Sequence, residues 1–235
     1  KDVRLIMHNG AKLILNNATI SNNPYDNCVL STGLWEGIKI NGRADIRLMN
    51  NSEISNTKSV LIESKLPQNK LIINIQSGSK LVNIFKNVLD ARNNFIYLRT
   101  NGASVINGKM SVLNCNGSLH INNTIFPASI PHEIVNCHLL IDNGSEFNTA
   151  LSVNNSANLK TLKIQNSKFT NLLHITGSKG PALIKGNTFT PNSSALRLDF
   201  VEKFDIVENI FDRCFECIKI YYNEEIVYIP ASGNY

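Results

Sequence analysis

The sequence predicts an all-β protein built as a parallel β-helix, a solenoid with coils of about 22 residues. Three observations carry this prediction: the composition, a phenylalanine that recurs at nearly constant spacing, and short alternating strands in step with it. The chain has 235 residues, of which 35 are asparagine, and it is 43% hydrophobic. Asparagine is a poor helix former that tolerates the left-handed conformation of tight corners. This composition argues against a helical bundle and favours strands joined by many corners.

A repeating unit runs along the chain: an alternating strand, a polar corner rich in asparagine, and a closing Phe or Ile. Its copies occupy residues 13–20, 46–54, 119–126, 140–147, 162–169, 183–189 and 205–211. Successive closing aromatics are 20 to 22 residues apart, at Phe126, Phe147, Phe169, Phe189 and Phe211. A coil of this length cannot bury its apolar side alone, so successive coils are expected to stack.

A second alternating strand follows each corner. Its apolar–polar–apolar triplets are residues 151–153, 173–175, 196–198 and 218–220, with centres 22 or 23 residues apart. Residues 38–40 and 60–62 show the same spacing of 22 near the start. A leucine-rich repeat needs its own Leu and Asn pattern and usually a helix, and a propeller blade needs about 40 residues. Neither fits, so the pattern indicates stacked coils of parallel sheet.

Asparagine and glycine are expected at the corners. Asn-Gly pairs, which favour tight turns with positive φ, begin at Asn9, Asn41, Asn101, Asn107, Asn116 and Asn143. Asparagines at the same place in successive coils are expected to hydrogen-bond along the stack. The asparagine content is therefore explained by architecture.

The repeat is interrupted between Leu61 and Tyr97, which are 36 residues apart. We therefore expect a lengthened coil or loop over residues 63–94, and a second excursion over residues 24–33. Such insertions project from a solenoid and often form its binding surface, although an ordinary irregular turn is the simpler interpretation and is favoured. Residues 1–235 otherwise form one domain. Because residues 226–230 resemble the opening of another coil, we expect a fragment of a longer protein.

The start of the chain resembles a known family. Residues 33–42, Gly-Leu-Trp-Glu-Gly-Ile-Lys-Ile-Asn-Gly, resemble the W-x-G-I-x-V-x-G segment of secreted right-handed β-helix proteins of Bacteroidetes. Residues 10–20 resemble the coil G-A-x-L-x-L-x-N-x-T-I that precedes this segment, and residues 51–54 resemble the N-S-x-I coil that follows. The match covers the chain from its start to about Val60. The remainder is similar only to the generic coil of the pectate-lyase-like superfamily.

The resemblance implies a right-handed coil and an exported protein that is secreted or attached to the cell surface, outside the outer membrane. Such proteins often carry a C-terminal sorting domain for type IX secretion. Any contact with the secretion machinery would involve regions other than residues 1–235.

Charge and hydropathy exclude several classes of partner. The net charge is +5, but Lys and Arg are scattered along the sequence. No basic run with interleaved aromatics of the kind that follows nucleic acid is present. No apolar stretch approaches the roughly 18 to 20 residues of a membrane-spanning helix. We therefore expect no nucleic-acid partner and no membrane-spanning segment.

Two pairs of cysteines are candidates for disulfide, metal or redox chemistry. Cys115 and Cys137 lie 22 residues apart in matching contexts, so stacked coils would bring them within disulfide reach. A reduced ladder of small apolar thiols is the alternative, and it is favoured. Cys214 and Cys217 have CxxC spacing, but they lack a second CxxC and a nearby pair of histidines. The sequence therefore predicts no metal site and no cofactor.

One outward ladder is the candidate ligand-binding face, with one residue per coil: Ser152, His174, Arg197 and Lys219. Beside it run Asn154, Thr176, Asp199 and Tyr221. Arg and Lys on such a face could hold uronate or sulfate groups. A glycosidase needs two suitably spaced carboxylates, and a calcium-dependent lyase needs several that converge. Only Asp199 lies on this face, with Glu202 in the following turn, so we predict a solvated polar face without catalytic residues.

Trp35 is the only tryptophan, and it is either a sugar-stacking platform or a packing residue. Packing is favoured because Trp35 falls within the structural motif of the family.

The sequence thus predicts a non-catalytic structural or adhesive segment of an exported bacterial surface protein, which contacts a glycan or another surface protein. The alternative is a polysaccharide lyase or hydrolase that acts on acidic glycans through the outward ladder. A third hypothesis, a fibre similar to a phage tail spike, predicts a stable trimer.

Overall fold

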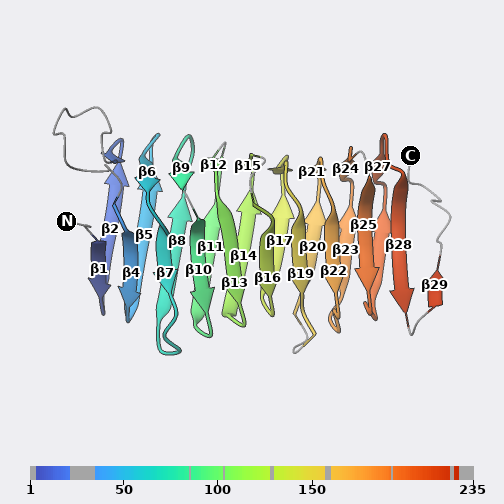
Figure 1. Ribbon diagram of the computed structural model, residues 1–235, viewed down its shortest axis with the longest axis horizontal. Helices are drawn as coiled ribbons and strands as arrows, with labels where there is room; N and C mark the ends of the chain where they lie inside the picture. Colours follow the sequence, from blue (N-terminus) through green and yellow to red (C-terminus); the bar gives the residue numbers. More distant parts are fainter. Residues whose placement is uncertain are drawn as a thin grey trace.

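The protein is a parallel β-solenoid with three sheets that run along its length (Figure 1). The structure, a computed structural model, describes residues 4–21, 35–84, 86–102, 104–127, 130–156, 160–191, 193–222 and 225–227. Each coil contributes one strand to each sheet in turn, and the strands pair with their equivalents in the neighbouring coils. The predicted all-β parallel coil is therefore confirmed.

Sheet A, which has 11 strands, consists of β1 (Arg4–His8), β4 (Gly37–Asn41), β7 (Ile62–Ser64), β10 (Asn87–Arg92), β13 (Lys109–Leu113), β16 (His132–Val135), β19 (Leu151–Asn154), β22 (Leu173–Thr176), β25 (Ser194–Asp199), β28 (Glu216–Tyr222) and β29 (Glu225–Val227). Sheet B, which has nine, consists of β2 (Ala11–Asn16), β5 (Arg43–Met49), β8 (Lys70–Ile75), β11 (Phe95–Thr100), β14 (Asn116–Asn122), β17 (His138–Asp142), β20 (Leu162–Gln165), β23 (Ala182–Lys185) and β26 (Phe204–Val207). Sheet C also has nine: β3 (Thr19–Ile20), β6 (Glu53–Thr57), β9 (Lys80–Ile84), β12 (Ser104–Ile106), β15 (Thr124–Phe126), β18 (Glu146–Phe147), β21 (Lys168–Phe169), β24 (Thr188–Phe189) and β27 (Ile210–Phe211).

The core is a set of apolar columns, because each inward position is occupied by a similar residue in successive coils. The recurring phenylalanines form the clearest column. Their rings stack with centroid separations of 4.5, 5.2, 5.2 and 4.9 Å from Phe126 through Phe147, Phe169 and Phe189 to Phe211. The four rings from Phe126 to Phe189 are fully buried. The period predicted from these residues is thus the physical repeat of the solenoid.

The corners use asparagine as predicted. Ten asparagines in the described part of the chain have positive φ, and so does the glycine of each of the six Asn-Gly pairs. Side-chain amides bond from coil to coil, as where Asn50 Nδ2 donates to Asn16 Oδ1 and Asn136 Nδ2 donates to Asn114 Oδ1, both at 2.7 Å. These bonds confirm the expected asparagine ladders.

A second polar ladder, which was not predicted from the sequence, lies inside the corner between sheets B and C. From the corner between β5 and β6 onward, each coil places one small polar side chain there, almost fully buried: Ser52, Ser79, Ser104, Thr124, Ser145, Ser167, Asn187 and Asn209. Several of them bind backbone atoms of the corner, as where Asn187 Oδ1 accepts from the Ser167 amide at 3.1 Å. The ladder therefore satisfies buried backbone groups that the turn leaves without a sheet partner.

Residues 63–94 form a lengthened coil with strands in all three sheets rather than a projecting loop. Leu61 and Tyr97 are far apart in sequence because Leu61 directly precedes a strand of sheet A, whereas Tyr97 lies in sheet B. The coil is nevertheless long, since Ile62 pairs with Leu89, a wider separation than in the regular coil that joins Leu151 to Leu173. The extra length includes residues 65–69, which form a longer turn between β7 and β8 than Gly42 forms between β4 and β5.

Two further expectations about the repeat are corrected. Lys39 pairs with Glu63 rather than with Leu61, because the coil between them is slightly longer than the regular period. Residues 225–227 do not open another parallel coil, since β29 pairs antiparallel with β28. The expected excursion over residues 24–33 lies outside the described residues.

Trp35 packs into the solenoid as predicted. Its side chain belongs to the core and is 8% exposed. Its Nε1 donates to the Ser55 carbonyl at 2.9 Å, so the polar atom of the indole is satisfied within the fold. A ring buried in this way offers no platform for a sugar.

Candidate functional site

The candidate ladder lies on the outward face of sheet A. Ser152 pairs with His174, His174 with Arg197, and Arg197 with Lys219, on strands β19 to β28. The parallel row of Asn154, Thr176, Asp199 and Tyr221 is in the same register. The apolar residues between them point inward and are buried, as Leu173 and Ile175 on β22 show. The structure therefore brings together all six residues predicted for this face.

His174, Asp199 and Arg197 form a hydrogen-bonded cluster on this face. His174 Nε2 lies 2.8 Å from Asp199 Oδ2 and 3.0 Å from Thr176 Oγ1. Arg197 Nε donates to both oxygens of Asp199 at 3.0 Å. Burial of Asp199 is the largest single influence on its pKa and raises it, but the hydrogen bonds from Arg197 and His174 outweigh burial. The net effect lowers the pKa of Asp199, so this carboxylate is ionised and its charge is matched by Arg197.

Lys219 is also paired within the face. Its Nζ donates to Glu216 Oε1 at 3.0 Å, and Ser194 Oγ donates to Glu216 Oε2 at 2.8 Å. The hydrogen bond from Ser194, followed by that from Lys219, lowers the pKa of Glu216. The guanidinium carbon of Arg197 lies 4.7 Å from the centroid of the Tyr221 ring. The two long cations predicted to hold a ligand are thus each engaged by an acid of the same face.

The ladder is longer than the predicted four residues. Through the register of sheet A it continues from Ser152 toward the N-terminus as Glu133, Ser111, Asp90, Glu63 and Lys39. Glu63 and Asp90 were not predicted because the coil between them is longer than the regular period. A search for polar residues flanked by apolar neighbours, with the coil length left free, would have found both.

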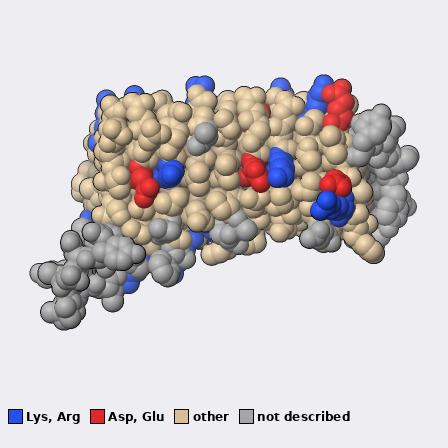
Figure 2. Space-filling view, turned by 90° about the horizontal axis from the view of Figure 1, so that it is seen from above, with Lys and Arg blue, Asp and Glu red and all other residues tan. Residues whose placement is uncertain are grey.

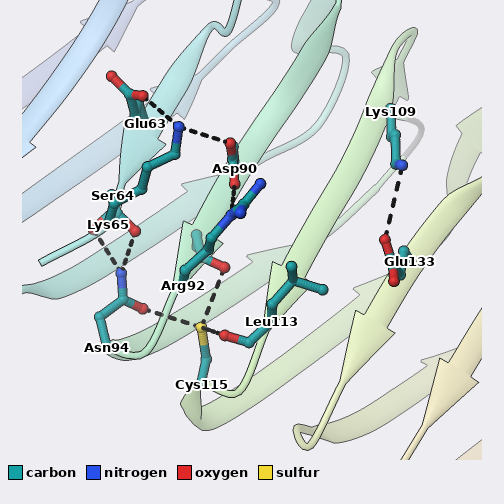
Figure 3. A network of polar contacts seen from close by, with 11 residues as sticks. Glu63, Ser64, Lys65, Asp90, Arg92, Asn94, Lys109, Leu113, Cys115 and Glu133 are labelled. Carbon is teal, nitrogen blue, oxygen red and sulfur yellow. Dashed lines mark hydrogen bonds and ion pairs between the residues drawn. The ribbon is translucent and has the colours of Figure 1, made fainter. Parts of the chain in front are cut away.

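Glu63 and Asp90 correct the expectation that Asp199 is the only carboxylate on this face, since they lie in the same outward row as direct register partners on β7 and β10. Figure 3 shows that cations surround them. Lys65 Nζ bridges the two, 2.6 Å from Glu63 Oε1 and 3.1 Å from Asp90 Oδ2. Arg92 Nε donates to Asp90 Oδ1 at 2.9 Å, and Arg4 lies 3.3 Å from Glu63. The lysine therefore occupies the place between the carboxylates that a cation or a reacting group would need.

The paired thiols lie beside this network. Cys115 and Cys137 are fully buried free thiols in the structure, and Cys137 Sγ donates to the Cys115 carbonyl at 3.4 Å. Cys115 Sγ donates to Asn94 Oδ1 at 3.1 Å (Figure 3). The contact between the thiols lowers the pKa of Cys115 and raises that of Cys137. The two residues stack in adjacent coils, as their spacing predicted.

We expect mass mapping under non-reducing conditions to find free thiols at both Cys115 and Cys137. Each is sealed from solvent and hydrogen-bonded to a carbonyl or amide oxygen, so neither thiol is accessible to an oxidant. The same digest after full unfolding with an alkylating agent serves as the control for accessibility. A linked peptide pair between residues 115 and 137 in the native sample would instead establish the disulfide.

The second cysteine pair, Cys214 and Cys217, consists of half-buried free thiols. Burial, followed by the charge of Cys217, raises the pKa of Cys214 to about 12. Within the residues that the structure describes, no three His, Cys, Asp or Glu side chains are grouped so as to hold a metal ion. The described residues also include no helix long and apolar enough to cross a bilayer.

The fold and this face together define a parallel β-solenoid with an ion-paired sheet face. Comparison with protein-family models, with curated proteins and with solved structures finds no match for the chain.

Proposed function

We propose that the chain is a non-catalytic structural or adhesive segment of an exported cell-surface protein. In this role the long sheet faces would contact a glycan or another protein. The observation that carries the proposal is the state of the sheet A acids. Asp199, Glu216, Glu63, Asp90 and Glu133 each have a cation within 4.0 Å, so none of these five is held free as a general base or nucleophile. General acid–base catalysis requires a group poised to exchange a proton, and a carboxylate engaged by a cation is not poised in that way.

The export of the protein and a right-handed coil remain part of this proposal. A right-handed sense is supported by the general rule that connections between parallel strands of one sheet are right-handed. Export is supported by the resemblance of residues 10–54 to secreted solenoids.

The alternative enzymatic function rests on one contact, the 2.8 Å separation between His174 Nε2 and Asp199 Oδ2. A carboxylate in that position can orient a histidine that acts as a base. In a lyase, His174 would then abstract a proton while Arg197 held the uronate.

A screen of acidic polysaccharides for unsaturated or reducing-end products separates the two functions. We expect no product above the background of a heat-denatured sample. Product that disappears in His174→Ala or Arg197→Ala, but persists in Lys168→Ala on sheet C, would overturn the proposal in favour of the enzyme. Light scattering tests the fibre hypothesis independently, since only that hypothesis requires a stable trimer.

A further inference from the structure

We propose that the outward face of sheet B over β2, β5, β8 and β11 binds an acidic polysaccharide. Its carboxylate or sulfate groups would pair with free cations while a sugar ring lies on Tyr97. This inference rests on the proposed adhesive role and names its ligand, but it places the ligand on a different sheet from the ladder predicted from the sequence.

The register of the four strands sets the outward side chains in three rows. The first row is Arg43, Lys70 and Phe95; the second is Lys12, Asp45, Ile72 and Tyr97; the third is Ile14, Arg47, Asn74 and Arg99. Neighbours within a row are about 4.8 Å apart across the strands. We call this set the basic–aromatic face. It unites five cations from four different coils, which lie far apart in the sequence between Lys12 and Arg99.

The cations of this face are in excess over its acids. Asp45 is the one acid in the three rows, and it is held by Arg47, whose NH2 lies 2.7 Å from Asp45 Oδ2. Lys12, Arg43 and Arg99 are exposed and have no ion-pair partner among the described residues. Unpaired cations gathered on one surface attract a polyanion and pair with its carboxylates or sulfates. The face therefore carries four positive charges more than negative ones.

The other two sheets do not offer such an excess. On sheet A, Arg197 and Lys219 are engaged by Asp199 and Glu216, and the same ladder also carries the acids Glu63, Asp90 and Glu133. Figure 2 looks onto the side of the molecule formed by the sheet C strands; in the middle of this view most of the surface is uncharged and the Lys and Arg lie beside Asp or Glu, while other Lys and Arg show at its margins. There Lys168 Nζ is 3.3 Å from Glu146 Oε1. The basic–aromatic face is thus distinguished by unpaired charge, not by the number of its cations alone.

Aromatic surface is presented among these cations. Tyr97 is 43% exposed and Phe95 is 47% exposed, two residues apart on one strand and so on the same side. The Lys70 ammonium lies 5.6 Å from the centroid of the Tyr97 ring, which places charge beside the ring face. A hollow of about 200 Å³ between the strands is lined by Lys12 and Arg43, among others. An amphipathic ring next to a charged hollow suits a ligand with both an apolar ring face and acidic groups.

The polar groups of the face favour sugars over nucleic acid. Asp45 and Asn74 lie in its middle and offer acceptors for hydroxyl donors, which a sugar chain supplies in number. Asp45 is paired with Arg47, so it adds no unpaired negative charge that would repel the acidic groups of a sugar chain. Tighter binding of a single-stranded nucleic acid than of an acidic polysaccharide would contradict the assignment of a sugar ligand.

Binding to the intact chain is measured by calorimetry or biolayer interferometry with polygalacturonate, chondroitin sulfate, neutral dextran and oligo(dT). We expect at least one acidic polysaccharide to bind, binding to weaken as salt is raised, and dextran not to bind. Arg43→Ala, Arg99→Ala and Tyr97→Ala should each raise the Kd about tenfold or more, since a lost charged or stacking contact has that magnitude. Matched controls on other faces are Lys168→Ala for charge and Phe215→Ala, whose ring is 90% exposed, for aromatic surface.

The proposal is overturned if neither acidic polysaccharide binds, if oligo(dT) binds more tightly than both, or if the control variants lose as much affinity as the face variants. These results would not affect the proposed non-catalytic adhesive role, because that role is tested separately, by whether the polysaccharides are cleaved. Product release from the same polysaccharides would instead remove the adhesive role, whichever face binds.

Discussion

Replacing Phe147 by alanine is expected to lower the free energy of unfolding by about 3 to 5 kcal/mol, the usual cost of truncating a buried aromatic. The ring is fully buried between Phe126 and Phe169, at centroid distances of 4.5 and 5.2 Å. Its loss opens a cavity in the middle of the column, and neighbours fixed by parallel pairing on both sides cannot close it. Urea unfolding followed by far-UV circular dichroism measures the change.

Phe215→Ala is the matched control, because the Phe215 side chain is 90% exposed and its loss should change stability by no more than about 0.5 kcal/mol. Phe147→Leu, which retains most of the buried volume, should fall between the two. A loss below about 1 kcal/mol for Phe147→Ala would contradict the view that the aromatic column carries the core.

Acidification from pH 6.5 to pH 4 is expected to remove about 3 kcal/mol of stability through His132 alone, since each pKa unit corresponds to about 1.4 kcal/mol. His132 is 1% exposed and packs edge-on against Phe126, with ring centroids 5.0 Å apart. Burial, followed by the positive charge of Lys109, lowers its pKa from 6.5 to about 4. Its Nδ1 accepts from the Met110 amide at 3.0 Å, which requires an unprotonated nitrogen at that position.

The direction follows from proton linkage. Between pH 6.5 and 4 the unfolded chain binds a proton at His132 that the folded chain does not bind, so the contribution of His132 is complete above pH 6.5 and is lost progressively down to about pH 4. The titratable groups near His132 are Lys109 and Glu133, which pair at 3.8 Å. His132→Asn keeps an acceptor for the Met110 amide but cannot titrate in this range. Equal slopes of stability against pH for the variant and the wild type would show that His132 is not responsible.

The repeat could be predicted because its signals are local in sequence. An alternating strand, an asparagine corner and a closing phenylalanine fall within one short segment, so the unit from Leu140 to Phe147 is recognisable without a structure. The length of a coil, in contrast, cannot be recognised from one such short segment. The segment from Ile62 to Leu89 includes a longer turn, and a fixed spacing therefore misplaced both Leu61 and the carboxylate pair of Glu63 and Asp90.

The register of the candidate face was predicted from the sequence, whereas the ion pairs on that face were not. Alternation and coil spacing placed His174, Arg197 and Lys219 on one face, which depends only on register. Whether Arg197 is free depends on Asp199, two residues away on the same side, and whether Lys219 is free depends on the rotamer that reaches Glu216.

The group of cations on sheet B was not predicted, because its members come from coils of unequal length. Residues as distant in sequence as Lys12 and Arg99 come to lie on one face only after coiling. The steps from Lys12 to Asp45, from Asp45 to Ile72 and from Ile72 to Tyr97 are 33, 27 and 25 residues, all longer than the regular period, so a fixed spacing does not align their outward positions. A surface assembled across irregular coils therefore requires the register of the folded sheet.

The buried polar ladder between sheets B and C also bears on how such a chain can evolve. Most coils bring one buried hydroxyl or amide to this corner, and several of these, such as Ser145 and Asn187, bind backbone carbonyls there, while several coils bring a phenylalanine that extends the column. Duplication or deletion of one whole coil would therefore change the rod by a step of about 4.8 Å while leaving every remaining contact type intact. Unequal genetic exchange can therefore change the length of the solenoid, and with it the number of positions in each outward row, without requiring a new arrangement of core side chains.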